Sequence, residues 1–246
     1  MDMNSKWYHY VLEIAHKAVR IPGVKSLLKP IYYLFKKWVE DSQRRRFLRN
    51  GLHVLQQFDI CMADFGVEYT LAYGTLLGAV REKGFIKHDF DIDVYVWAED
   101  YSERMAVALK AAGFELIHDF MVEDGTIGRE ETYKYEGVAI DIFYVYDGGE
   151  YPYCCDFTTI DGVPTFNQCM QKYGRVRARK FDLPMNRQRE RVPFETIELY
   201  IPKNAHHVLN FIYGPDYMTP DPNYDSNSWN EHIHIWEDKA AYYREM

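Results

Sequence analysis

The stretch from Tyr69 to Val96 (YTLAYGTLLGAVREKGFIKHDFDIDVYV) constrains the fold of this chain more than any other. Residues 70–73 look extended and include the β-branched Thr70 and the aromatic Tyr73, so they predict a strand. A glycine breaks that run, a short helix is expected over 76–81, and Gly84 is expected to end this helix. A second strand over 90–94 follows. The stretch therefore predicts a strand, turn, helix, loop and strand in close succession.

The second strand carries two aspartates at alternate positions. Strand alternation places Asp91 and Asp93 on one face of the sheet. Two carboxylates that face the same way repel each other, and a divalent cation would remove that repulsion. Hard oxygen ligands favour Mg²⁺ or Mn²⁺. Asp141 lies inside a later apolar strand and also needs a partner, so it is a third candidate ligand. The alternative interpretation is that the pair consists of ordinary solvated residues on an edge strand.

The turn between the first strand and the helix is a candidate phosphate site. Gly74 and Thr75 stand at the predicted start of the helix, and Thr75 is expected to cap it. Free N–H groups and the helix dipole at such a position attract phosphate. This phosphate site and the aspartates are separated by one helix and a loop, so the two are expected to bind the same nucleotide.

Basic residues are concentrated near the N-terminus of a chain that is acidic overall. Residues 1–50 carry 11 Lys or Arg and 4 Asp or Glu, whereas the whole chain has a net charge of −8. Within residues 6–38, apolar side chains recur at helical spacing on both sides of Pro22-Gly23. This pattern predicts amphipathic helices that lie on an anionic membrane surface, or that pack on the domain or on a second subunit.

Hydrophobic periodicity predicts further elements along the chain. We expect helices over 42–64, 99–112 and 204–213, strands over 114–117, 132–135, 138–145 and 194–201, and a short helix in the tail after Ser228.

Two other features suggest binding, and each has a simpler reading. Cys154, Cys155 and Cys169 fit no standard zinc spacing, so buried reduced thiols are expected rather than a zinc site. The basic run from Lys172 to Arg191 would contact donor phosphates or an anionic acceptor, or else would be a solvated loop.

The N-terminus has no apolar signal region and no run reaches transmembrane length, so a cytoplasmic location is expected, with a peripheral position at the inner face of the cell membrane as the alternative.

Residues 74–93 (GTLLGAVREKGFIKHDFDID) resemble the hallmark of the LicD family, which includes the fukutin-like transferases. That hallmark is G-T-L-L-G-x-x-R, then G-F-I, then an aspartate-rich D-x-D-I-D. Residues 140–143 resemble the family's third-carboxylate strand, and residues 213–218 resemble its C-terminal Y-G-x-x-[WY]-M element. Lys87-His88 replaces the usual Pro-Trp, and Phe90 stands where Asp is common. The resemblance covers about residues 45–222.

The resemblance implies a fold and a division of the chain. The fold is α+β, a nucleotidyltransferase-like mixed sheet flanked by helices, with an N-terminal helical segment. The expected parts are a basic amphipathic helical segment over 1–41, a catalytic domain over 42–222 and a C-terminal helical tail over 223–246.

The resemblance also implies an activity. Members transfer phosphocholine or a related phospho-substituent from a CDP-linked donor, here most simply CDP-choline, to a sugar hydroxyl of a glycan or lipid-linked glycan, with release of CMP. The expected metal ligands and catalytic residues are Asp91, Asp93 and Asp141, which would hold Mg²⁺ or Mn²⁺, and Asp141 would also accept the hydroxyl proton. The expected donor-binding residues are Gly74, Thr75, Arg81 and Asp89, with Arg81 either reaching phosphate or bracing Asp89.

Two other functions use the same features. A nucleotidyltransferase would move NMP from an NTP to a small molecule with the same carboxylates. A non-catalytic, membrane-associated glycan-binding scaffold would keep the fold without turnover, although it has no need of three aspartates. No nucleic-acid partner is expected, and the sequence leaves an oligomer open.

Overall fold

The computed structural model describes residues 25–221 and 232–246. The chain divides into two compact units, residues 1–49 and 50–246. Helix α2 (Lys25–Phe65) is continuous through that division. The boundary expected between residues 41 and 42 therefore falls inside a helix. The reason is local, because the sequence has no glycine between Gly23 and Gly51 and is rich in good helix formers.

The predicted membrane-surface segment is described only in part. Its residues 6–24 lie outside the described residues, and the rest belongs to α2. Tyr33, Leu34 and Trp38 on this helix are exposed over half of their surface or more. Among the described residues, no helix combines the length and the apolar character needed to cross a membrane. Membrane contact through this segment stays a prediction.

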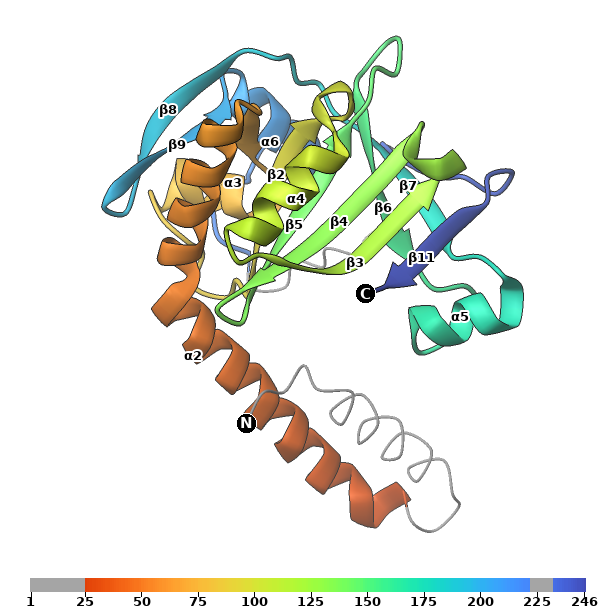
Figure 1. Cartoon of the computed structure of the whole chain (residues 1–246). Helices are drawn as coiled ribbons and strands as arrows, with labels where there is room; N and C mark the ends of the chain where they lie inside the picture. The colour runs from red at the N-terminus through yellow and green to blue at the C-terminus, as the bar shows by residue number, and fades with distance from the viewer. Residues whose placement is uncertain (1–24, 222–231) are drawn as a thin grey trace. The chain divides into compact units, whose positions relative to one another are not determined.

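A six-stranded mixed sheet is the centre of the unit formed by residues 50–246 (Figure 1). Its strand order is β1-β2-β5-β4-β3-β11, in which β2 and β5 run parallel and the other neighbours run antiparallel. The strands are β1 (Tyr69–Leu71), β2 (Asp91–Trp97), β3 (Glu115–Val122), β4 (Gly128–Tyr135), β5 (Val138–Val145) and β11 (Ala241–Glu245). The α+β mixed sheet is thus confirmed.

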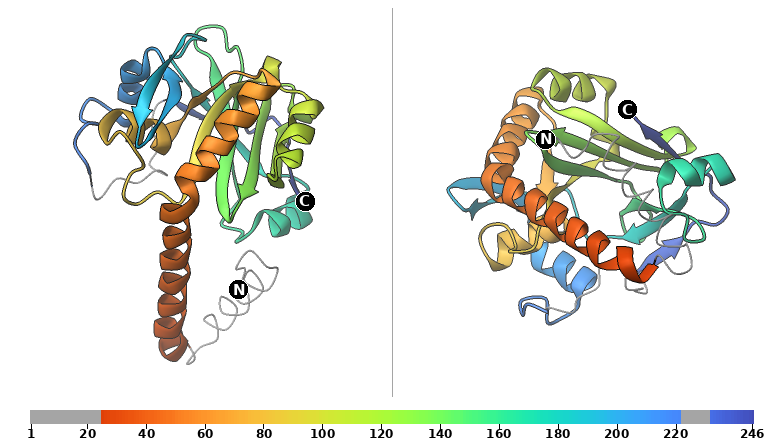
Figure 2. Two further views of the ribbon diagram at one scale, coloured as in Figure 1. Left: turned by 60° about the vertical axis from the view of Figure 1, so that its left-hand side comes forward. Right: turned by 90° about the horizontal axis from the view of Figure 1, so that it is seen from below.

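The two faces of the central strands differ in polarity. Ile92, Val94 and Val96 are fully buried on one face of β2. Helix α4 (Glu103–Ala111) and the part of α2 beyond residue 50 cover one face of the sheet, called here the helix-covered face (Figures 1 and 2). Burying apolar side chains there is the main source of stability for these strands.

A second layer packs on the other side of the sheet. It is a three-stranded sheet in the order β10-β7-β6, with β6 (Tyr153–Thr158), β7 (Arg177–Asp182) and β10 (Ile233–Ile235). Its core includes Phe157 of β6, which stacks on Phe120 of β3 with ring centroids 5.0 Å apart. The remaining elements are the helices α3 (Tyr73–Arg81), α5 (Phe166–Tyr173) and α6 (Ala205–Tyr213), short 3₁₀ turns at Ala98–Asp100 and Glu123–Gly125, and a hairpin of β8 (Arg189–Phe194) and β9 (Ile197–Pro202).

Residues 232–246, the described part of the tail, form no helix, which corrects the prediction of a helical tail there. They form β10 and β11. β11 adds to the edge of the main sheet, where Ala241 pairs with Val122 and Glu245 pairs with His118. Backbone pairing with an open strand edge outweighs the weak helical pattern of these residues, and tyrosines favour a strand.

Two local predictions are also wrong. The range 194–201, expected to be one strand, contains the turn of a hairpin, because the chain reverses at Glu195, whose φ is +50°. The strand β8 ends before this turn and β9 follows it. The first strand ends at Leu71, and helix α3 begins at Tyr73 with Ala72 as its N-cap, so Thr75 is inside the helix and does not cap it. A buried partner for the Thr75 hydroxyl, described below, explains the difference.

Candidate functional site

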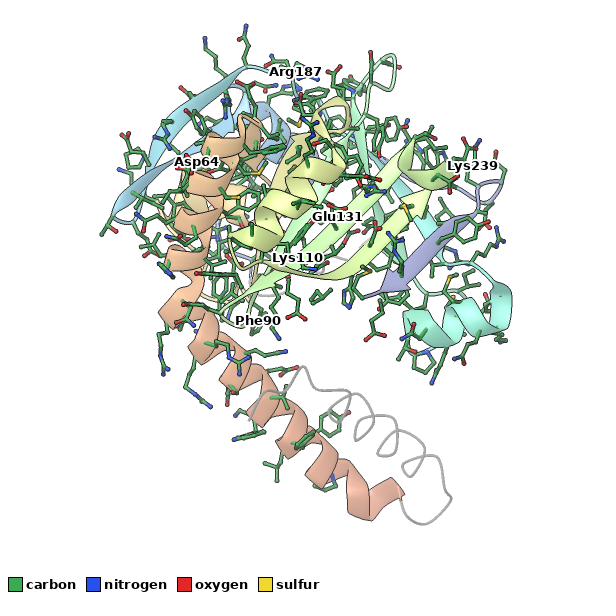
Figure 3. All side chains as sticks on the ribbon, in the orientation of Figure 1. Asp64, Phe90, Lys110, Glu131, Arg187 and Lys239 are labelled. Carbon is green, nitrogen blue, oxygen red and sulfur yellow. The ribbon has the colours of Figure 1, made fainter. Side chains whose placement is uncertain are left out.

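Three carboxylates converge where the parallel strands β2 and β5 meet. Asp93 and Asp141 are directly opposite each other in the strand register, and Asp91 is on the same face of β2. One oxygen from each of the three side chains lies within 4.8 Å of the others. The structure thus places Asp91 and Asp93 on one face, as strand alternation predicts, and brings Asp141 next to them; their role as metal ligands stays a prediction. Phe90, labelled in Figure 3, stands immediately before Asp91.

These carboxylates disfavour one another's charge. Burial and the neighbouring Asp91, Asp141 and Asp89 raise the pKa of Asp93 well above its usual range. Burial and Asp91 raise the pKa of Asp141 to about 7. Burial also raises the pKa of Asp91. Three acids held this close need a compensating positive charge to be ionised together at neutral pH.

Hydrogen bonds orient the side chains of the cluster. The backbone N–H of Gly74, in the first turn of α3, donates to the Asp93 carboxylate. The Thr132 hydroxyl of β4 donates to Asp141. The Thr75 Oγ accepts the backbone N–H of Asp93 at 2.9 Å and so fixes the start of β2 against the helix. The start of α3 therefore serves the carboxylate cluster directly.

The cluster fits a hard divalent cation. The three oxygen atoms converge within 4.8 Å of one another, and carboxylate oxygens are ligands that Mg²⁺, Mn²⁺ and Ca²⁺ prefer. The donor set is made of oxygens alone, which suits these metals and not zinc. Within the described residues, this is the one group of three such side chains with converging ligand atoms.

A cavity of about 1140 Å³ opens next to the carboxylates. It is large enough for a nucleotide-linked small molecule. Its walls come from helices α3 and α6, from the loop that precedes β2, and from strands β4, β5, β6 and β7. The residues that line it include Tyr73, Gly74, Asp89, Asp91, Asp93, Glu130, Phe143, Asp156, Phe157, Arg179, Phe181 and Asp182.

The structure separates the four predicted donor-binding residues into two pairs. Gly74 and Asp89 line the cavity, and a side chain at Gly74 would stand 3.5 Å from Asp89 and 3.6 Å from Asp93. Thr75 is buried and its hydroxyl is engaged by Asp93. Arg81 donates to Glu82 and to the Tyr217 carbonyl oxygen, and neither it nor Thr75 lines the cavity.

Asp89 has its own partner. Its carboxylate accepts the backbone N–H of Ile86 at 2.9 Å. Burial, partly opposed by that hydrogen bond, raises the pKa of Asp89 to about 7, and Asp91 adds to the rise. Asp89 thus shapes the loop that precedes β2. Arg81 acts on Asp89 through its charge, which lowers the pKa of that carboxyl, whereas the hydrogen bond to Asp89 comes from the Ile86 backbone.

Sequence reasoning missed several polar residues of the cavity. Glu130 of β4, Asp156 of β6 and Arg179 of β7 all line it. Arg179 pairs with Asp156 through two hydrogen bonds, one of them from Nε at 2.8 Å. Arg179 belongs to the basic run noted in the sequence. No local pattern marks Glu130 or Asp156, because their positions depend on how two sheets meet.

Comparison with known proteins places the chain in a family. Residues 66–204, more than half of the chain, match the family model described as LicD/FKTN/FKRP, nucleotidyltransferase domain. The chain belongs to the LicD/FKTN/FKRP family. The matched range contains all three clustered aspartates, the first turn of α3 and the Glu130, Asp156 and Arg179 side chains.

Individual relatives match over a similar range. The chain is 30% identical over 138 residues to the lipopolysaccharide cholinephosphotransferase LicD of Haemophilus influenzae, which covers 52% of this chain and 49% of that protein. It is 25% identical over 144 residues to the ribitol-5-phosphate transferase FKTN of Macaca fascicularis, which covers 56% of this chain and 30% of that protein. The match therefore spans no more than about half the length of either relative.

Proposed function

We propose that this LicD/FKTN/FKRP-family chain transfers phosphocholine, or a related phospho-substituent, from a CDP-linked donor to a sugar hydroxyl of a cell-surface glycan, with release of CMP. The observation that carries the proposal is the convergence of Asp91, Asp93 and Asp141 beside a cavity of about 1140 Å³. The matches to a cholinephosphotransferase and to a ribitol-5-phosphate transferase support this reaction class.

In this proposal, Asp91, Asp93 and Asp141 hold Mg²⁺ or Mn²⁺. The ion, when bound, would neutralise charge on the donor diphosphate. Gly74, which has no side chain, leaves the cavity wall open next to the carboxylates for the donor phosphates. The N–H of Gly74 already serves Asp93, so its proposed role is to give access and to orient that carboxylate.

The remaining chemistry needs no covalent intermediate. The acceptor hydroxyl oxygen forms a bond to the distal phosphorus, and the bond from that phosphorus to the CMP oxygen breaks. The hydroxyl proton passes to a carboxylate of the cluster. Asp141, directly opposite Asp93 on the neighbouring strand, is the proposed proton acceptor. Positioning and charge neutralisation provide the rate enhancement.

The test is a panel of CDP-linked donors incubated with Mg²⁺ or with EDTA, with CMP release as the readout. We expect Mg²⁺-dependent release by the wild-type protein, which does not require a known acceptor because the donor can be hydrolysed. Asp91→Asn should lower this rate by about 100-fold or more. Asp64→Asn, the same chemical change at an exposed α2 position labelled in Figure 3, should leave the rate unchanged.

Each rival function gives a different readout. Release of pyrophosphate from an NTP would identify a nucleotidyltransferase instead. Near-normal CMP release by Asp91→Asn would show that the carboxylate assignment is wrong. Absence of metal-dependent turnover with every donor, in a protein that is folded by circular dichroism, would favour the binding scaffold.

A further inference from the structure

Two neighbouring glutamates on β4 have opposite surroundings. Glu131 points to the helix-covered face of the sheet and is labelled in Figure 3. It accepts hydrogen bonds from Arg129 at 2.8 Å, from the Tyr144 hydroxyl at 2.7 Å and from the Tyr133 hydroxyl at 3.2 Å. Glu130 points the other way and lines the cavity. Among the described residues, no group donates a hydrogen bond to Glu130 and no cation forms an ion pair with it.

The other carboxylates of the cavity have partners. Asp156 is held by Arg179. Asp182 is held by Lys180 at 3.1 Å and by His234 at 2.9 Å. The three clustered aspartates are assigned above to a metal ion, and Asp89 accepts a backbone N–H. Glu130 is therefore the cavity carboxylate for which the described part of the chain provides no compensating group.

Neighbouring negative charges make an uncompensated charge on Glu130 more unfavourable. Asp141, Asp156 and Asp93 all act on it, and together with burial they raise its pKa well above the usual range, against a smaller opposing effect of Arg179. Arg179 is already committed to Asp156 through two hydrogen bonds. A partly buried carboxylate in such a field is expected to have a positive partner. The metal ion proposed at Asp93 and Asp141 would offset part of this field, and a cationic group on the substrate would offset the charge of Glu130 itself.

One aromatic ring is next to this carboxylate, and two more line the same cavity. Phe143 of β5 is directly opposite Glu130 in the strand register. The ring of Tyr73 contacts Phe143, with centroids 4.9 Å apart, and also Phe181, with centroids 6.2 Å apart. Phe143, Tyr73 and Phe181 all line the cavity together with Glu130. Aromatic faces next to a carboxylate attract an ammonium group and offer a neutral polyol much less.

We propose that Glu130 and the Phe143 ring form a subsite for a positively charged ammonium group on the transferred phospho-substituent, an inference that rests on the proposed function. The subsite is one strand away from the metal cluster, because Glu130 is on β4 and Asp141 is on β5. In this proposal, a donor whose diphosphate lies at the aspartates extends its terminal group toward Glu130. The subsite would select amino-alcohol donors over polyol donors.

The test compares the binding of three probes by calorimetry in the presence of Mg²⁺: CDP, CDP-choline and CDP-glycerol. We expect the wild-type protein to bind CDP-choline about tenfold more tightly than CDP-glycerol. Glu130→Gln keeps the size and shape of the side chain, and it should weaken CDP-choline about tenfold while changing CDP-glycerol less than about twofold. Phe143→Leu should weaken CDP-choline alone, by a smaller factor.

Asp182→Asn is the matched control, because Asp182 lines the same cavity but already has Lys180 and His234 as partners. It should leave the preference for CDP-choline intact. Equal weakening of both donors by Glu130→Gln would overturn the subsite and point to a general positioning or proton-transfer role. Equal binding of both donors by the wild-type protein would overturn it as well. Failure of CDP itself to bind would overturn the proposed function together with the subsite.

Discussion

Replacing Asp141 by Asn should stabilise the metal-free protein while abolishing its response to Mg²⁺. The pKa of Asp141 is about 7 in the folded protein, against an ordinary value of 3.8. A difference of about 3 pH units corresponds to roughly 4 kcal/mol of unfavourable free energy at high pH. Burial is the largest cause of this cost, followed by repulsion from Asp91. Because neighbouring carboxylates titrate together, we expect about half of it, roughly 2 kcal/mol, on removing the Asp141 charge. Asn retains an oxygen that can accept from Thr132.

The sign of the pH dependence follows from the same values. The folded, metal-free protein binds more protons at Asp141 than the unfolded chain does between about pH 4 and pH 7. Its stability should therefore fall as the pH rises through that window. Asp141→Asn should flatten this fall. Metal reverses the effect in the wild-type protein, because a cation favours the ionised carboxylates.

The assay is thermal unfolding at pH 7.5 with EDTA or with excess Mg²⁺. A ligand present at 100 times its Kd stabilises by about 2.7 kcal/mol. For a domain of this size, that is a rise in Tm of roughly 5–10 °C for the wild-type protein. Asp141→Asn should unfold roughly 4–8 °C higher than the wild-type protein in EDTA and should show little further rise with Mg²⁺. A lower Tm in EDTA would show that the charge of Asp141 does not destabilise the metal-free protein, and an unchanged Mg²⁺ response would show that Asp141 does not bind the metal.

Two further predictions concern how α3 is held against β2. Thr75→Val removes the acceptor of the buried Asp93 N–H and should lower the free energy of unfolding by about 1–3 kcal/mol. Thr75→Ser keeps the oxygen and should lower it less. Chemical denaturation measures both variants. Gly78→Ala would place a methyl group 2.4 Å from the Gly84 carbonyl oxygen, so the loop after α3 must shift. We expect a loss of about 1–3 kcal/mol in the same assay, and an unchanged midpoint would contradict the close approach.

The parts of the site that sequence reasoning found are those that a local rule determines. Strand alternation alone puts Asp91 and Asp93 on one face, and the apolar run around Asp141 predicts its strand. Thr75 was assigned wrongly as a cap because its partner, the Asp93 N–H, is 18 residues away in the sequence. The tail was assigned wrongly for a similar reason, since β11 needs the edge of β3, more than 100 residues earlier.

The register of the sheet, rather than any motif, determines the surroundings of each acidic side chain on β4. On β4, alternation sends Glu131 into a network with Arg129 and two tyrosines and sends Glu130 into the cavity. A one-residue shift of β4 against β5 would exchange the two glutamates. It would also move Thr132 away from Asp141, and the carboxylate cluster would lose a donor. Metal binding and the proposed ammonium subsite therefore depend on the same register, so a substitution that disturbs the pairing of β4 with β5 should affect both together, whereas Glu130→Gln should affect the subsite alone.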